Sequence, residues 1–312
     1  MKTRSGLELS KIGIGSYGIG GRGHRDMPIT EKDVNEVYIQ AVSYSLEKGS
    51  NFTEIALGYG HGESLSLFKA GLDRSIKDRE DIFMTHSLYP RDLPTLHAIQ
   101  DDIASFHKVM DTYYADSTLV TQSLILKFGE DEIYSILHEL LESGQSRYVS
   151  LSNASPSWII KFKNEFSDNF ITHEGHLSFE VRALQEKGVF DVCNELNVEN
   201  ILWRPLRRNK TLDCDWPLLV ELATKYQKKQ SQIILNWMCN QGYRPMVFST
   251  NKAHIDENLS ATNFQMLAEE YKQMKNFRPS NYNPPAIDWE GPMIDDDIVG
   301  LVSDFDLHIT NT

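Results

Sequence analysis

The chain has 312 residues, of which 40% are hydrophobic and 24% charged, and this balance excludes a disordered or fibrous protein. Its 31 basic and 44 acidic side chains give a net charge of −13, which disfavours nucleic acids and anionic membranes as partners. The chain has no apolar run of the ~20 residues that a membrane-spanning helix needs, and no secretory signal at its start. Its three cysteines stand at no metal-ligand spacing. We therefore expect a globular, cytoplasmic protein with reduced cysteines.

Short β-branched runs alternate with longer stretches whose apolar residues recur at helical spacing. The short runs predict eight strands, at residues 11–16, 51–56, 81–86, 117–122, 146–153, 170–178, 200–206 and 245–250. The longer stretches predict eight helices, at residues 33–48, 63–77, 96–110, 130–143, 156–166, 184–196, 217–228 and 255–261. Several have typical ends, such as Thr30 as an N-terminal cap and Gly49 or Gly144 as a C-terminal stop.

This alternation is typical of βαβ units around a parallel sheet. Eight strands that are each followed by a helix favour a closed (β/α)8 TIM barrel, an α/β fold, as a single domain over residues 1–276. An open doubly wound sheet is the alternative, but the glycine-rich segment 18–23 lacks the spacing of a dinucleotide-binding turn. Residues 277–312, with their prolines and acidic side chains, predict a C-terminal tail that packs on the barrel or acts as a substrate lid or dimer arm.

Five segments stand out in chain order: LSKIGIGSYGIGG, NFTEIALGYGHGESL, LHELLESGQSRYVSLSNAS, ILWRPLRRN and HIDENLSA. Together, over about residues 9–277, they resemble the aldo-keto reductases. The resemblance implies a (β/α)8 barrel that binds NADPH in an extended form and transfers hydride to a small-molecule aldehyde or ketone. In that family an aspartate, a tyrosine, a lysine and a histidine surround the carbonyl oxygen.

The resemblance further implies a catalytic site in which one of these four residues is unchanged. Tyr59 matches the tyrosine and Glu54 replaces the aspartate, while His86 replaces the lysine and Thr121 the histidine. A phenol has a pKa of about 10, so a nearby cation helps it to donate a proton near neutrality. We expect Tyr59 to be the proton donor and Glu54 and His86 to tune it. Thr121 can donate a hydrogen bond but cannot titrate.

The resemblance also implies a set of cofactor contacts. Ser152 and Asn153 match the pair that holds the nicotinamide carboxamide, and Trp203 matches the aromatic side chain that stacks on the ring. Glu174 stands in place of a glutamine, and an ionised carboxylate accepts hydrogen bonds but donates none. The remaining expected contacts are Pro205, Leu206, Arg208, Ser249, His254, Glu257 and Asn258.

The family's contacts to the 2′-phosphate of NADP fall on Phe248 and His254, and neither side chain carries a permanent positive charge. Lys252 is a possible substitute. The arginines of the segment 204–208 are candidates for the pyrophosphate. The resemblance therefore implies NADP or NAD as cofactor, with a slight preference for NADP.

Two functions from different classes remain open. The first is NAD(P)H-dependent carbonyl reduction with Tyr59 as the proton donor. The second is a degenerate member that binds a nucleotide or another small molecule without carbonyl reduction, or that performs non-redox acid–base chemistry. The groups for such chemistry are Glu54, Tyr59, His86 and Glu174. No metal site is expected, and the sequence predicts neither a substrate nor an oligomeric state.

Overall fold

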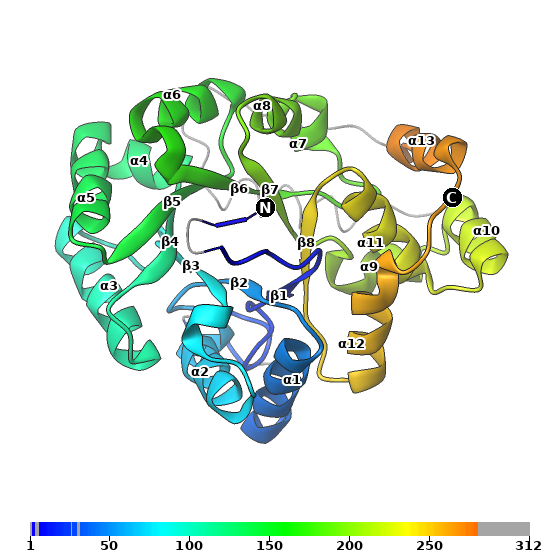
Figure 1. Ribbon diagram of the computed structural model, residues 1–312, viewed down its shortest axis with the longest axis horizontal. Coiled ribbons are helices and arrows are strands. Elements are labelled where there is room, and N and C mark those ends of the chain that lie inside the picture. Colours follow the sequence, from blue (N-terminus) through cyan, green and yellow to red (C-terminus); the bar gives the residue numbers. More distant parts are fainter. Residues whose placement is uncertain (1, 4–5, 26, 30–31, 280–312) are drawn as a thin grey trace.

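The computed structural model describes residues 2–3, 6–25, 27–29 and 32–279. Eight parallel strands follow one another in chain order around a closed barrel, and β1 pairs with β8 to close it. Helices cover the outside of the barrel (Figure 1). The predicted (β/α)8 TIM barrel is confirmed, and the open doubly wound sheet is excluded.

Each observed strand overlaps one of the eight predicted ranges. The strands are β1 (Gly13–Gly15), β2 (Phe52–Ile55), β3 (Phe83–Ser87), β4 (Ala115–Thr121), β5 (Ser146–Ser152), β6 (Phe170–His176), β7 (Glu199–Trp203) and β8 (Arg244–Val247). Neighbouring strands are in parallel register throughout, so that their carboxyl ends meet at one face of the barrel. Functional groups gather at this face in barrels of this kind.

Most helices lie where the sequence predicts them. The longer ones are α1 (Asn35–Glu47), α2 (Ser64–Arg74), α3 (Leu96–Met110), α5 (Glu130–Glu142), α6 (Pro156–Phe166), α10 (Pro217–Tyr226), α11 (Gln230–Asn240), α12 (Lys252–Leu259) and α13 (Ala268–Asn276). The short ones are α4 (Gln122–Phe128), α7 (Ala183–Glu186), α8 (Val189–Glu195) and α9 (Lys210–Asp213). Within the described ranges, no helix combines the length and the apolar character needed to cross a bilayer.

The helix predictions differ from the structure in a few places. The single helix expected over residues 184–196 is divided into α7 and α8 at Gly188, whose φ of +75° ends the first helix. The predicted helix ranges do not include α4, α9, α11 or α13, although Trp237 and Met238 of α11 were expected to lie in the core of a helix. Gly49 and Gly144 are confirmed as helix stops by φ values of +99° and +74°. The predicted cap Thr30 lies outside the described residues.

An apolar layer closes the bottom of the barrel. The N-terminal segment, β2, β3, β5, β7 and β8 each contribute one side chain to it. These are Leu9, Phe52, Phe83, Tyr148, Ile201 and Met246. Gly13 on β1 makes room for this layer, because a Cβ at its position would lie 2.4 Å from the Phe52 ring. The bottom is therefore sealed, and the opposite end is left for a ligand.

Polar side chains fill the barrel above this layer. The hydroxyl of Ser150 on β5 is hydrogen-bonded to the hydroxyls of Ser117 on β4, at 2.5 Å, and Thr172 on β6. Because side chains alternate along a strand, the next inward positions on β5 and β6 are Ser152 and Glu174, and both reach the open end. The inside of the barrel thus changes from apolar at the bottom to polar at the carboxyl ends of the strands.

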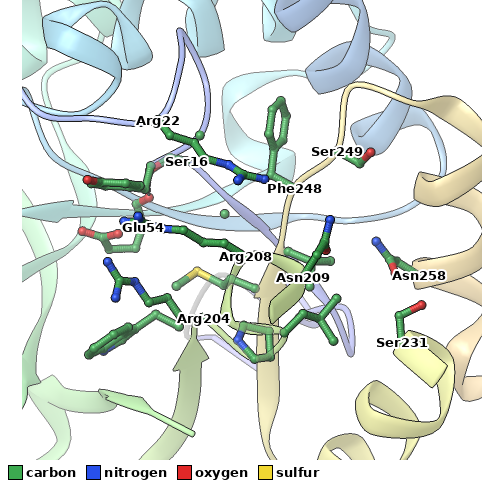
Figure 2. A pocket seen from close by; sticks show the side chains of 18 of the residues that line it. Ser16, Arg22, Glu54, Arg204, Arg208, Asn209, Ser231, Phe248, Ser249 and Asn258 are labelled. Carbon is green, nitrogen blue, oxygen red and sulfur yellow. Dashed lines mark hydrogen bonds between the residues drawn. The ribbon is translucent and has the colours of Figure 1, made fainter. Parts of the chain in front are cut away.

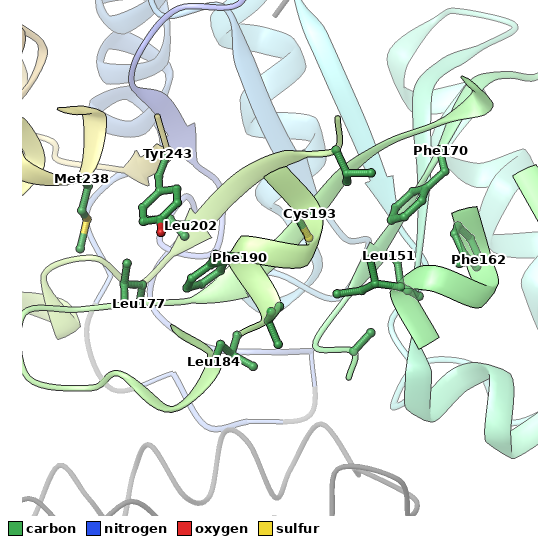
Figure 3. Close-up of a cluster of buried hydrophobic side chains, with 14 of the residues drawn as sticks. Leu151, Phe162, Phe170, Leu177, Leu184, Phe190, Cys193, Leu202, Met238 and Tyr243 are labelled. Atoms are coloured by element: carbon green, nitrogen blue, oxygen red, sulfur yellow. The ribbon is translucent and has the colours of Figure 1, made fainter. Parts of the chain in front are cut away.

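The largest apolar cluster lies outside the barrel, between the strands and the helices that cover them. Figure 3 shows part of it, with Leu151, Phe170 and Leu202 on strands and Phe162 and Phe190 on helices. Burial of this kind contributes about 25 cal/mol for each Å² of apolar surface. It holds the helices in place around the strands.

The first residue of the predicted tail packs on this body. The ring of Phe277 is stacked on that of Phe179 at 4.1 Å and meets Trp216 edge-on at 5.2 Å. Residues 280–312 lie outside the described part of the chain, so a lid or a dimer arm stays a prediction, as does the division into residues 1–276 and 277–312.

Candidate active site

A cavity of about 1670 Å³ opens at the carboxyl ends of the strands. The loops after β1, β2, β3, β7 and β8 form its walls. Figure 2 shows that it is elongated, with Glu54 on one side of the drawn residues and Asn258 on the other. We call this cavity the mouth of the barrel.

The mouth contains the tyrosine that the sequence singles out. The Tyr59 hydroxyl donates a hydrogen bond to Oε1 of Glu54 at 3.2 Å. Burial raises the pKa of Tyr59 well above its ordinary value, and the nearby Glu54 carboxylate raises it further. The phenol therefore keeps its proton at neutral pH, as a proton donor must before it reacts.

Two buried carboxyl groups share the mouth. Burial raises the pKa of Glu54 to about 7, against hydrogen bonds with Ser87 and Tyr59 that lower it. Glu174 on β6 has a pKa well above its ordinary value, first because it is buried and second because Glu54 is near. Two carboxyl groups that repel each other in a buried site do not ionise together easily. At neutral pH the pair therefore holds at least one proton.

His86 does not face the mouth, which corrects its expected role as a tuning cation. Its Nε2 atom lies 2.7 Å from Oδ1 of Asp102 on α3, and its ring is stacked on Phe106 at 4.3 Å. Both partners belong to the helix outside the barrel. His86 is buried between β3 and α3, on the opposite side of the strand from Tyr59.

Ser87 occupies the place that the sequence assigned to His86. Because successive side chains of a strand point to opposite faces, Ser87 faces inward where His86 faces outward. Ser87 lines the mouth and is hydrogen-bonded to Glu54. β3 thus brings a hydroxyl group to the site and no cation.

Thr121, the fourth expected catalytic residue, lines the mouth at the end of β4. Its hydroxyl accepts a hydrogen bond from the Leu124 backbone at 3.1 Å and lies 2.8 Å from the Ser123 hydroxyl. These contacts make it the N-terminal cap of α4. Its place in the mouth agrees with the prediction, and the cap accounts for the hydrogen bonds of its hydroxyl.

All eleven expected cofactor contacts line the mouth. They are Ser152, Asn153, Glu174, Trp203, Pro205, Leu206, Arg208, Ser249, His254, Glu257 and Asn258. The Ser152 hydroxyl donates to the backbone carbonyl of Glu174 at 3.0 Å, which joins the ends of β5 and β6. The half-buried Trp203 ring is stacked on His176 at 4.7 Å, so its orientation is set from one side. The structure therefore brings together the residues predicted to hold the cofactor.

Among the expected cations, Arg204 and Arg208 line the mouth, and Figure 2 shows both in the part of the cavity that contains Glu54. Phe248 lines it as well, whereas Lys252 on α12 does not. Arg207 is buried below the surface of the loop, and this corrects its expected role as a pyrophosphate ligand.

The buried Glu180 carboxylate holds Arg207 in place. One carboxylate oxygen accepts hydrogen bonds from Arg207 at 2.9 Å and from the Trp216 indole at 3.2 Å. The other accepts from the hydroxyls of Thr211 at 2.8 Å and Ser178 at 3.2 Å. A buried charge pair with its remaining lone pairs satisfied is the arrangement that offsets the cost of burial.

This network fixes a strained loop. Arg204, Arg207, Arg208 and Asn209 all have positive φ, between +48° and +73°. Such a conformation costs roughly 1–2 kcal/mol for each residue that is not glycine. The contacts of Glu180 offset that cost, and the loop carries Arg204 and Arg208 into the mouth.

A second pair of side chains beside Tyr59 was not predicted. Nε2 of the buried His24 lies 3.2 Å from Oδ2 of Asp92, and its ring meets that of Tyr59 edge-on at 6.1 Å. Gly58 makes room for this pair, because a Cβ there would lie 2.1 Å from His24 and 2.2 Å from Asp92. His24 and Asp92 come from different loops, and no motif in the sequence links them.

Comparison with known proteins agrees with this geometry. A profile of the "Aldo/keto reductase family" matches residues 11–279. The chain belongs to this family. The "Uncharacterized oxidoreductase YtbE" of Bacillus subtilis is 23% identical over 86% of this chain and 89% of its own length. The glyoxal reductase of the same organism is 22% identical over 86% of this chain and 89% of its own length.

Solved structures of aldo-keto reductases share the fold. The crystal structure of Bombyx mori aldo-keto reductase AKR2E4 in complex with NADP has a TM-score of 0.72 to this chain, at 19% identity, and covers 93% of this chain and 96% of its own. In this chain, Glu54 and Ser87 line the mouth beside Tyr59.

Proposed function

We propose that this aldo-keto reductase uses NADPH to reduce a small aldehyde or ketone, with Tyr59 as the proton donor and Glu54 as the group that resupplies its proton. The observation that carries the proposal is the hydrogen bond between Tyr59 and Glu54 inside a mouth that all eleven expected cofactor contacts line. The relatives named as reductases, and the neighbour bound to NADP, support the cofactor and the reaction class.

The residues of the mouth fit a nicotinamide nucleotide. The elongated cavity has room for an extended ligand, and Oε1 of Glu174 is buried there without a hydrogen-bond partner among the described residues. Ser152, Asn153 and Trp203 would hold the nicotinamide, and Glu257 and Asn258 the adenine. When bound, the cofactor supplies the hydride that adds to the carbonyl carbon.

The chain's own residues supply the proton. Tyr59 donates its phenolic proton to the carbonyl oxygen as negative charge develops there. Glu54, with a pKa of about 7, is partly protonated at neutral pH and can return a proton to the phenolate. This relay does the work that a neighbouring cation does by lowering the pKa of the phenol. Overall one hydride and one proton reach the substrate, and Glu54 recovers its proton from water.

The test is an assay of NADPH oxidation with methylglyoxal, glyoxal and a panel of aromatic and aliphatic aldehydes. We expect turnover with at least one small carbonyl compound, and tighter binding of NADPH than of NADH. If the protein binds NADPH but oxidises it with none of these compounds, the proposed reaction is wrong for this substrate class.

A second candidate is a member of the family that binds a nucleotide without carbonyl reduction, or that performs acid–base chemistry without redox. The raised pKa of Tyr59 favours it, because a phenol that holds its proton more tightly is a weaker acid. Binding of NADPH with no turnover on the whole panel is the result that this candidate predicts.

A further inference from the structure

Glu174 is a buried acid whose carboxyl group is not explained by contacts among the described residues. It lies on β6 with 2% of its surface exposed, and its Oε1 atom has no hydrogen-bond partner in the described part of the chain. The neighbouring Ser152 hydroxyl donates to the backbone carbonyl of Glu174 and not to its side chain. A buried polar atom without a partner is costly, so such an atom at the wall of a cavity points to a ligand.

The groups around Glu174 bear on its charge. From the β2 side come Glu54 and Tyr59, which interact with it electrostatically. Ser152 at the end of β5 and the following residue Asn153 are also near, and neither is charged. Beyond β7 lies Arg204, and on β6 itself lies His176, which burial and the nearby arginines keep neutral by lowering its pKa.

We propose that Glu174 stays protonated in the mouth and that its neutral carboxyl group binds the carboxamide of the nicotinamide, so that one proton on this residue controls nucleotide affinity. This inference rests on the proposed function. It makes Glu174 a binding residue for the cofactor, and it explains how an acid can occupy a position where the family has a glutamine.

The chemistry follows from the hydrogen bonds that each form can make. A protonated carboxyl group has a donor and an acceptor side by side, which matches the acceptor and donors of a primary amide. A carboxylate has acceptors only, so it would face the amide carbonyl with a repulsive lone pair. Protonated Glu174 therefore presents the same pattern as a glutamine side chain, and ionised Glu174 does not.

The surroundings favour the protonated form. Burial raises the pKa of Glu174 well above its ordinary value, and the charge of Glu54 adds to the effect. No hydrogen bond from the described residues to Oε1 stabilises the carboxylate. Because the protonated form binds, affinity should be highest at low pH and should fall as pH rises through the pKa of Glu174.

The experiment is a calorimetric titration of the wild type and Glu174→Gln with NADPH, repeated from about pH 6 to about pH 9. In the wild type we expect the dissociation constant to rise with pH, by at least tenfold once Glu174 has lost its proton. In Glu174→Gln, whose amide cannot lose a proton, we expect the dissociation constant to stay nearly constant. Thermal unfolding of both proteins at each pH verifies that they are folded.

Two controls separate this effect from a general change of charge in the mouth. The first is 2′-phospho-ADP-ribose, which lacks the nicotinamide, and its affinity should show the same pH dependence in both proteins. The second is Glu54→Gln, which removes the charge that raises the pKa of Glu174. In that variant the loss of NADPH affinity should begin at lower pH than in the wild type.

The outcomes distinguish this inference from the function on which it rests. If the wild type binds NADPH with an affinity that does not change with pH, or if Glu174→Gln shows the same decline, Glu174 does not act through its proton. The proposed function would then stand. If the wild type binds no NADPH at any pH, the proposed function itself is contradicted.

Discussion

Tyr59 and Glu54 form the pair on which the chemistry of the mouth depends. The phenol donates to Oε1 of Glu54 at 3.2 Å, and burial raises the pKa of that carboxyl group to about 7. An ionised Glu54 draws the phenolic proton toward itself, whereas a protonated Glu54 can donate to the phenol and free its proton for a substrate. The charge of Glu54 therefore decides where the proton of Tyr59 points.

Removal of the Tyr59 hydroxyl should abolish proton transfer and leave the cofactor site intact. We expect Tyr59→Phe to lower kcat by about 10²- to 10⁴-fold, the usual contribution of general acid catalysis, with little change in NADPH affinity. Tyr89→Phe is the matched control, because Tyr89 lines the same mouth with its ring 6.2 Å from that of Tyr59. Equal kcat values for Tyr59→Phe and the wild type would exclude Tyr59 as the proton donor.

Turnover should depend on pH through Glu54. Because protonated Glu54 is the active form and its pKa is about 7, kcat at saturating NADPH should be constant at low pH and fall as pH rises above 7. Glu54→Gln cannot change its charge, so its lower kcat should not vary across this range. A decline that is the same in Glu54→Gln and the wild type would assign the pH dependence to another group.

Substitutions of the adjacent residues His86 and Ser87 should affect different properties, stability and the pH dependence of kcat, because the two side chains face opposite sides of β3. His86→Leu breaks the contact with Asp102, and we expect it to lower the free energy of unfolding by about 1–3 kcal/mol with kcat unchanged. Ser87→Ala removes a hydrogen bond that lowers the pKa of Glu54, so the pH at which kcat declines should rise. Urea denaturation and pH profiles measure both effects. A large loss of kcat in folded His86→Leu would contradict the orientation of His86.

The stability of the protein should depend on the buried ion pair between Arg207 and Glu180, which holds the loop of residues 204–209. Arg207→Met leaves the Glu180 carboxylate buried without its cation, and we expect a loss of about 3–5 kcal/mol in the free energy of unfolding. Lys161→Met breaks an exposed pair with Glu130 and should cost about 1 kcal/mol or less. Urea denaturation of the two variants compares them directly. Similar losses would mean that Glu180 does not hold the loop.

The barrel could be predicted because strand signals are local. Each strand lies in a short segment that contains β-branched and apolar residues, and the order of such segments along the chain favours this topology. No range was predicted for helix α11, although Trp237 and Met238 were expected to lie in the core of a helix. Its residues 231–238 are all buried, so no exposed polar face marks where the helix begins and ends.

The orientation of β3 could not be predicted for a related reason. All five residues of β3 are buried, and its sequence FMTHS has no clear alternation of apolar and polar side chains. The pattern therefore does not say whether His86 or Ser87 faces inward, and a comparison of motifs placed the wrong one in the mouth. Glu54 and Tyr59 were placed correctly, because Tyr59 follows its strand in a glycine-flanked turn.

Contacts between loops that are distant in the chain could not be predicted from the sequence. Arg207 meets Glu180 across 27 positions, and His24 meets Asp92 across two different loops. Nothing near Arg207 in the sequence distinguishes it from Arg204 and Arg208, which remain in the mouth. In the folded loop the buried Arg207 is set apart by its ion pair with Glu180, whereas Arg204 and Arg208 line the mouth.

The proposed function requires a reduced nicotinamide to bind in the mouth against Trp203. The most direct measurement is the tryptophan fluorescence of the wild type, Trp203→Phe and Trp158→Phe during titration with NADPH. Trp203 lines the mouth and Trp158 lies on α6, outside the barrel. We predict saturable quenching that is kept in Trp158→Phe and largely lost in Trp203→Phe. No quenching of the wild type at millimolar NADPH, or equal quenching in all three proteins, would contradict the account.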